Sequence, residues 1–395
     1  MKKIFLIILF YFIFIGISLA EEKWINNLPG PTSPELIDCL KSSIGEKNLE
    51  KYFSSKKKRK NQRPSSEHEG MMRKCFVNPS HQNINCVAEG KKINRVKNNK
   101  IIGVFGPTLW QWSRNNSFKD ANEIKETGSN TAGIGLLLFI NKKGELAFGE
   151  GKAPELNQYL CAIGSALKQA NESGLSTYLA IIPQIMSGKK GVERSKLKGK
   201  QREVFLNELE NILPLIAKFA ERHAVNYFAP LSEPEKRVGT KLAVSWMAKV
   251  PKIIKPHFNG LLVWQSADDY YKGKFPKFEG GYDLFGIIVL FSRSSVSEIN
   301  EYYSTRRSEL AKLNKAIISS GIDRVFAAEF GFIEKPNIKK SISSKIYYKY
   351  LNLIKPYTEE VLFLENPSDM KSGKTQQVKG TFIEDIIKKL TSNNQ

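Results

Sequence analysis

From residue 100 onward, short runs of apolar residues alternate with longer amphipathic stretches. The runs have the length and residue types of β-strands, and they cover residues 101–105, 131–139, 176–182, 227–231, 261–265, 284–291, 325–329 and 361–364. Strands that are apolar on both faces are typical of a parallel sheet covered by helices on each side. Eight such strands in about 290 residues predict closure into an α/β fold, the (β/α)8 TIM barrel.

The stretches between the strands repeat apolar residues at helical spacing. They predict helices over residues 118–126, 155–173, 202–223, 240–254, 296–319 and 344–354, with a last helix over residues 382–390. The link between the fifth and sixth strands, residues 268–282, is rich in glycine and aromatic residues and is not predicted to be helical.

Polar and aromatic residues follow the apolar runs, where a TIM barrel carries its active residues. They are Trp110 and Trp112 after the first strand, Gln184 after the third, Ser232 and Glu233 at the fourth, Trp264, Gln265 and Asp268 at the fifth, Glu329 at the seventh and Glu365 after the eighth. A glutamate at the end of a buried strand is costly unless it has a partner or a task. Two of them facing each other are what glycoside hydrolysis requires.

This part of the chain, about residues 100–391, resembles the retaining glycoside hydrolases of clan A, such as β-mannanases and β-glucanases. The resemblance rests on the strand order, on Ser232-Glu233-Pro234-Glu235 at the fourth strand and on Ala328-Glu329-Phe330-Gly331 at the seventh. It implies that Glu233 is the general acid/base and Glu329 the nucleophile in a double displacement on a β-linked polysaccharide or oligosaccharide. It implies no metal and no cofactor, and no glycine-rich dinucleotide turn follows the first strand.

The remaining strand-end residues are candidates for substrate binding. The indole faces of Trp110, Trp112 and Trp264 suit stacking on sugar rings, with Tyr270 and Tyr271 as further platforms. Gln184, Ser232, Gln265 and Asp268 are candidate polar contacts at the rim.

Other interpretations stay open at the same positions. Ser232 stands where the clan has Asn, so a barrel that binds carbohydrate at a cell surface without cutting it is the alternative function. Glu233 could instead form a salt bridge with Lys236 or Arg237, and Glu235 has the pattern of a solvated or helix-capping charge.

The first 20 residues have the pattern of a signal peptide. Two lysines precede an apolar run, and Ser18-Leu19-Ala20 is a small-x-small cleavage site. We expect a secreted or cell-surface protein that begins near Glu21. An uncleaved anchor is the alternative, because the run is only slightly shorter than a membrane span.

Residues 21–99 predict a small helical module before the barrel, which takes residues 100–395. Cys39 and Cys75 lie in two helical patterns, and we expect a disulfide between them, with Cys86–Cys161 as a weaker expectation. A zinc site is not supported, because the cysteines have no Cys-x-x-Cys spacing. The four histidines, none of them at the carboxyl end of a predicted strand, do not support a Ser-His-Asp or Cys-His mechanism either.

The chain carries 61 Lys and Arg against 39 Asp and Glu, a formal charge of +22. The excess is concentrated in residues 41–100, which include a run formed by Lys56, Lys57, Lys58, Arg59 and Lys60. Such a run could bind an anionic polymer of the cell surface, or it could be a solvated loop. We expect no nucleic acid partner for an exported protein.

Overall fold

The computed structural model describes residues 34–53, 65, 67–68, 71–72, 75, 94–96, 100–106, 118–148, 156–187, 191–193, 197–267, 271–278, 280–291, 296–332, 340–365 and 378–392. The chain separates into two compact units, one formed by residues 1–86 with 148–161 and the other by residues 87–147 with 162–395. Within the described residues, no helix combines the length and the hydropathy of a membrane span.

The described residues of the first unit include the short helices α2 (Pro34–Ile44) and α3 (Glu46–Phe53). Gly45 joins them with a φ of +77°, a conformation that glycine adopts without strain. Leu40, Leu49 and the Cys39–Cys75 disulfide lie in a small core, so the predicted disulfide is confirmed. Cys161 is also disulfide-bonded, whereas Cys86 and the basic run of residues 56–60 lie outside the described residues.

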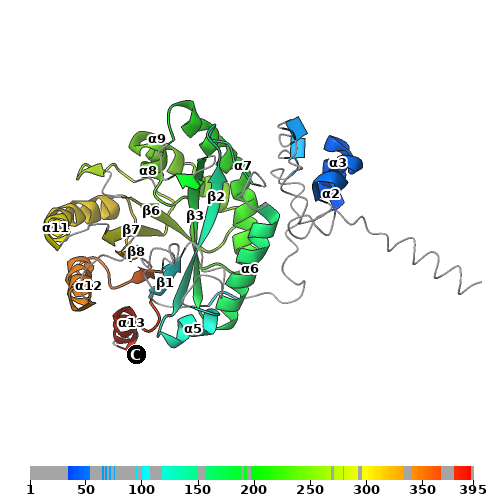
Figure 1. Cartoon of the computed structure of the whole chain (residues 1–395). Helices are drawn as coiled ribbons and strands as arrows, with labels where there is room; N and C mark the ends of the chain where they lie inside the picture. The colour runs from blue at the N-terminus through cyan, green and yellow to red at the C-terminus, as the bar shows by residue number, and fades with distance from the viewer. Residues whose placement is uncertain are drawn as a thin grey trace, which may run out of the picture. The chain divides into compact units, whose positions relative to one another are not determined.

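The second unit is a closed barrel of eight parallel strands (Figure 1), which confirms the predicted TIM barrel. The strands are β1 (Ile102–Gly106), β2 (Thr131–Ile140), β3 (Ser176–Ser187), β5 (Tyr227–Ala229), β6 (Leu261–Ser266), β7 (Leu284–Phe291), β8 (Val325–Phe332) and β9 (Val361–Leu364). Pairing of β1 with both β2 and β9 closes the ring. A short strand that was not predicted, β4 (Gly191–Glu193), pairs antiparallel with the end of β3.

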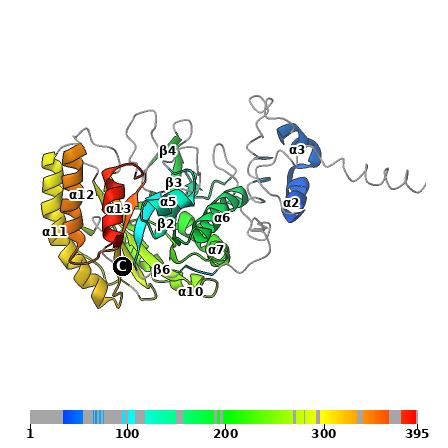
Figure 2. The same ribbon diagram turned by 90° about the horizontal axis from the view of Figure 1, so that it is seen from below.

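Helices surround the strands, as Figures 1 and 2 show. They are α5 (Ala121–Glu126), α6 (Leu156–Glu172), α7 (Lys200–Arg222), α8 (Pro234–Val238), α9 (Thr240–Met247), α10 (Val250–Ile254), α11 (Val296–Ser319), α12 (Lys340–Ile354) and α13 (Phe382–Ser392). The single helix predicted over residues 240–254 is two helices. Pro251 has no N–H to donate to the Met247 carbonyl, and the Tyr282 hydroxyl donates to that carbonyl instead, at 2.8 Å.

The barrel interior is filled by alternate residues of the strands. Tyr178 of β3, Tyr227 of β5 and Phe326 of β8 belong to this inner cluster together with Val263 of β6 and Ala328 of β8. Their neighbours along each strand point outward into the helical layer. This alternation decides which strand-end side chains reach the mouth of the barrel.

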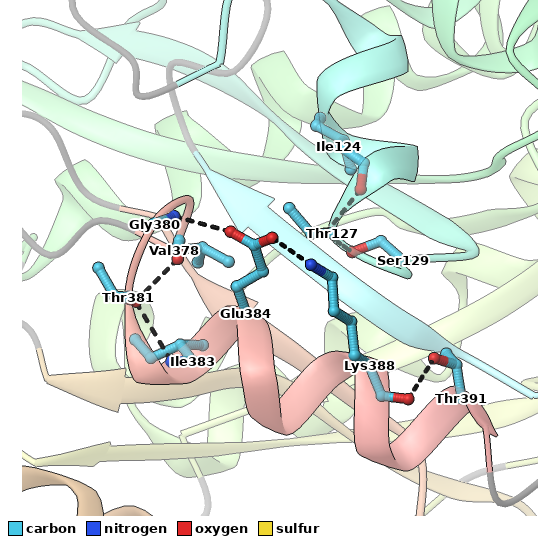
Figure 3. Close-up of polar contacts among 10 residues, drawn as sticks. All are labelled: Ile124, Thr127, Ser129, Val378, Gly380, Thr381, Ile383, Glu384, Lys388 and Thr391. Atoms are coloured by element: carbon cyan, nitrogen blue, oxygen red, sulfur yellow. Dashed lines mark hydrogen bonds and ion pairs between the residues drawn. The ribbon is translucent and has the colours of Figure 1, made fainter.

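The last helix, α13, lies against β1 and the turn that follows α5. Glu384 accepts the Gly380 N–H at 2.7 Å and pairs with Lys388 at 2.6 Å, and these contacts (Figure 3) stabilise the first turns of this helix. A Cβ added at Gly128 would lie 3.1 Å from the Thr391 hydroxyl oxygen. The turn and the helix therefore pack closely.

We predict that Gly103→Ala in β1 destabilises the barrel. A Cβ at residue 103 would lie 1.9 Å from the backbone oxygen of Thr131 on β2, and a strand pair cannot absorb that clash without moving apart. The free energy of unfolding from urea denaturation should fall by at least about 2 kcal/mol. Gly280→Ala is the control, because a Cβ there meets no atom within 4 Å. Equal stability of the two variants would contradict the close approach of β1 and β2.

Candidate active site

Glu233 follows the fourth barrel strand, β5, and occupies the N-cap position of α8. The chain leaves the strand between its neighbours: the Ser232 N–H donates to the Ile181 carbonyl at 2.7 Å, and the Glu233 N–H to the Gln265 carbonyl at 3.2 Å. Glu233 has a φ of +52° and precedes Pro234. This left-handed conformation costs a residue with a side chain about 1–2 kcal/mol, so the position of Glu233 is held by its surroundings.

Glu329 lies on the seventh barrel strand, β8, at a β-bulge. Ile287 of β7 pairs with Ala327 but Ile288 pairs with Glu329, so β8 has one extra residue, Ala328, at this point. Without a bulge, side chains alternate and Glu329 would point away from the barrel, since Ala328 faces the interior. The bulge turns Glu329 inward, where its carboxylate accepts a hydrogen bond from Gln265 at 2.7 Å. The sequence predicts that this strand ends at Glu329, but it continues to Phe332.

The two carboxyl groups interact electrostatically. Burial and the negative charge of Glu233 raise the pKa of Glu329 from its usual 4.5 to about 8, against the opposing effect of Lys236, the Gln265 hydrogen bond and Arg237. Both side chains keep some exposure at the mouth of the barrel; the Glu233 side chain is 14% exposed. The structure thus brings together the two glutamates that the sequence singled out.

Two cations of α8 hold the Glu233 carboxylate. The Lys236 ammonium lies 2.7 Å from Oε1, and the buried Arg237 guanidinium lies 3.7 Å from Oε2. The salt-bridge interpretation of Glu233 is therefore correct as far as its contacts go. Nearby cations favour the charged form of a carboxyl group, whereas burial favours the neutral form of Glu329.

Gln265 and Tyr178 form a relay that the sequence analysis did not anticipate. Gln265, predicted as a substrate contact, is fully buried and donates to Glu329 from its amide nitrogen. The hydroxyl of the fully buried Tyr178 donates to the amide oxygen of Gln265. A tyrosine among the apolar residues of the third strand was the only available sign, because a buried phenol usually has a polar partner.

Glu235 is buried, so the expectation of a solvated charge was wrong. Its carboxylate accepts hydrogen bonds from the hydroxyl of Tyr271, from Ser266 Oγ at 3.1 Å, from the Ala267 N–H at 3.3 Å and from Trp264 Nε1 at 3.4 Å. Burial outweighs these donors and raises the pKa of Glu235 to about 7. All four partners come from the end of β6 and the segment after it, so Glu235 fastens α8 to β6.

Trp264 is a packing residue. Alternation along β6 places Val263 and Gln265 toward the interior and Trp264 outward, where its fully buried ring contacts Phe278, Tyr282 and Phe285. No ring face is left for the sugar stacking that the sequence suggested.

The other predicted site residues differ in their placement. Gln184 lies on the same face of β3 as Tyr178 and is half-buried near the end of that strand, whereas Ser232 is buried with its N–H bound to β3. Glu365 is buried and accepts the Val378 N–H at 2.8 Å, which gives it a structural task. Tyr271 is buried against Glu235. Trp110, Trp112, Asp268 and Tyr270 lie outside the described residues.

The described residues contain no group of three or more His, Cys, Asp or Glu side chains placed to hold a metal ion. Among the described residues, the barrel mouth presents two carboxyl groups with neighbouring cations and an amide.

Solved structures with a similar fold include glycoside hydrolases. A GH113 β-1,4-mannanase matches with a TM-score of 0.53 and 14% identity, over 74% of this chain and 99% of that one. The GH113 β-mannanase of Alicyclobacillus acidocaldarius, in complex with ManMIm, matches with a TM-score of 0.54 and 12% identity, over 76% of this chain and 100% of that one. A GH5-4 broad-specificity endoglucanase of Clostridium cellulovorans matches with a TM-score of 0.52 and 13% identity, over 75% of this chain and 94% of that one.

Comparisons of sequence alone find no match. No family model matches the chain, and none of the curated proteins matches it either. At these identities the structural likeness establishes the fold shared with clan A glycoside hydrolases, and the assignment of chemistry depends on the site itself.

We predict that Glu235 makes stability depend on pH. Its pKa is about 7 in the folded protein and 4.5 when unperturbed, so between these values the folded state binds a proton that the unfolded chain releases. The free energy of unfolding contributed by this group therefore falls as pH rises through this window. From pH 5 to pH 8 the wild type should lose about 2–3 kcal/mol more than Glu235→Gln.

Urea denaturation at a series of pH values measures this difference. Glu203→Gln, at an exposed position in the first turn of α7, should follow the wild type at every pH. A Glu235→Gln profile parallel to that of the wild type would show that the buried carboxyl does not titrate in this range.

Proposed function

We propose that the protein is a glycoside hydrolase that cleaves a β-linked polysaccharide or oligosaccharide with Glu233 and Glu329. The observation that carries the proposal is the pairing of these carboxyl groups, from the fourth and seventh barrel strands, close enough for the charge of one to raise the pKa of the other. The fold shared with β-mannanases and an endoglucanase supports it.

The proposed reaction is a double displacement with retention. Glu329 attacks the anomeric carbon and forms a glycosyl-enzyme while Glu233 donates a proton to the leaving oxygen; Glu233 then accepts a proton from the attacking water. The first step needs Glu329 ionised and Glu233 protonated at the start, whereas the second step begins with Glu329 esterified and Glu233 ionised. Since Lys236 and Arg237 favour the opposite distribution, the proton has to pass to Glu233 when substrate enters and changes these ion pairs.

A carbohydrate-binding barrel without catalysis is the second candidate. The ion pairs of Glu233 with Lys236 and Arg237 favour it, because they hold the residue that should act as acid in its charged form. The buried Ser232, where the clan has Asn, favours it as well. Both candidates use the same face of the barrel, and only product formation separates them.

We also propose that the chain is exported and retained near an anionic surface. This proposal rests on the leader pattern of residues 1–20 and on the basic run of residues 56–60.

We predict that the purified protein releases oligosaccharides from one member of a panel of β-mannan, β-glucan, xylan, galactan and peptidoglycan. Glu329→Gln should lower kcat by more than about 10³-fold, because the nucleophile is lost while its shape is kept. Mass spectrometry of the products measures both. Glu301→Gln, exposed on α11, should retain the activity. Binding to a polysaccharide with no product from the wild type would identify the non-catalytic barrel.

We predict that kcat/KM decreases above about pH 8. The pair must hold one proton, and with a pKa of about 8 for Glu329 its last proton leaves near that pH. Removing the positive charge of Lys236 strengthens proton binding, so Lys236→Met should move this decrease to higher pH. Lys241→Met, exposed on α9, should leave it in place. If kcat/KM decreases at the same pH in Lys236→Met as in the wild type, the carboxyl pair is not the origin of the decrease.

A further inference from the structure

Tyr178 is fully buried in the inner cluster of the barrel, and two hydrogen bonds in series connect it to Glu329. Its hydroxyl donates to Gln265 Oε1, and Gln265 Nε2 donates to Glu329 Oε1 at 2.7 Å. Tyr178 and Gln265 are fully buried, so water does not compete for either bond. Phe105 and Phe326 hold the phenol ring, with centroids 5.7 and 5.5 Å away.

The two ends of an amide differ in chemistry. An N–H2 group facing Glu329 stabilises its carboxylate, whereas a carbonyl facing it repels the carboxylate and accepts a proton from the neutral acid. Donation from Tyr178 fixes the oxygen of Gln265 at the far end and so turns the N–H2 end toward Glu329. Burial and the charge of Glu329 raise the pKa of Tyr178 well above its usual value, and the phenol stays a donor over the whole working range.

The groups around Glu329 give this orientation its importance. Burial and Glu233 disfavour the ionised form, while Lys236 and Arg237 of α8 and Gln265 of β6 favour it. Lys236 and Arg237 are shared with Glu233, at 2.7 and 3.7 Å from its oxygens. Of these three side chains, Lys236 and Arg237 also pair with the Glu233 carboxylate, whereas the Gln265 amide nitrogen donates to Glu329.

We propose that Tyr178 is a positioning residue for the proposed glycosidase reaction: through Gln265, it presents an amide donor to Glu329 and favours the ionised form of this carboxyl, which attacks the sugar. The proposal rests on the function proposed above, but the contacts it invokes exist with or without turnover. It can therefore be tested separately.

The test is a pH titration of the full chain labelled with 13C at the glutamate carboxyl carbons, in which Glu329→Gln identifies the Glu329 signal by its loss. In Tyr178→Phe the amide is no longer oriented, and the titration of Glu329 should move to higher pH by about one pH unit. On the substrate that the panel identifies, kcat/KM at pH 7 should fall about 10-fold with little change in KM.

Tyr227→Phe is the matched control. Tyr227 pairs with Tyr178 in register and belongs to the same inner cluster, but its ring lies beside Arg324, which precedes β8. This variant removes a hydroxyl from the same interior without touching Gln265. The Glu329 titration should stay in place, and a shift equal to that of Tyr178→Phe would overturn the proposal.

A double-mutant cycle identifies the route. If Tyr178 acts through Gln265, Tyr178→Phe should have no further effect on the Glu329 titration in a Gln265→Leu background. An unmoved titration in the single variant, or an undiminished shift in the double variant, would overturn the proposal. Titrations that behave as expected in a protein that releases no product would support the relay and refute the glycosidase.

Discussion

Holding a carboxyl group inside an apolar barrel beside a second carboxylate is costly, and the carboxyl end of this barrel is organised around that cost. Glu329 is raised to a pKa of about 8 by burial and by Glu233. Three groups oppose the cost: an amide from β6 and two cations from α8. Because α8 begins at the residue after Glu233, the acid and its cations move as one body. The buried Glu235 binds α8 to the end of β6. This contact fixes the position of Glu233 relative to Glu329.

Both glutamates depend on backbone that departs from regular structure. Glu233 adopts a φ of +52°, and Glu329 faces inward because Ala328 adds a residue to β8. Regular continuation at either point would direct the side chain into the helical layer or disrupt α8. Such departures persist only where the surroundings over-determine them. Hydrogen bonds from the N–H groups of Ser232 and Glu233 to β3 and β6 supply that constraint for Glu233, and the pairing with β7 supplies it for Glu329.

The barrel could be predicted because its strands are continuous apolar runs, and Glu233 and Glu329 could be found because each interrupts such a run. The hydrogen-bond partners of these two glutamates could not be predicted from the sequence. Tyr178 and Gln265 lie 87 positions apart, and nothing local relates them. Glu235 stands in a charged sequence that reads as solvated, and only the end of β6 buries it. The place of Trp264 at the end of an apolar run predicts a residue at the barrel mouth. The alternation of side chains along β6 instead turns it outward into the helical layer.

The pairing of β1 with β9 sets the order in which this chain can complete its fold. The Ile101 N–H donates to the Glu360 carboxylate at 3.0 Å, across 259 positions of sequence, and Glu360 also pairs with Arg324 at 2.8 Å. During synthesis β1 is made early, and its second neighbour, β9, is made only after most of the polypeptide. Its open edge, like that of β8, is exposed to wrong pairing for that time. A chain with this topology therefore gains from staying unfolded until β9 is available to pair with β1.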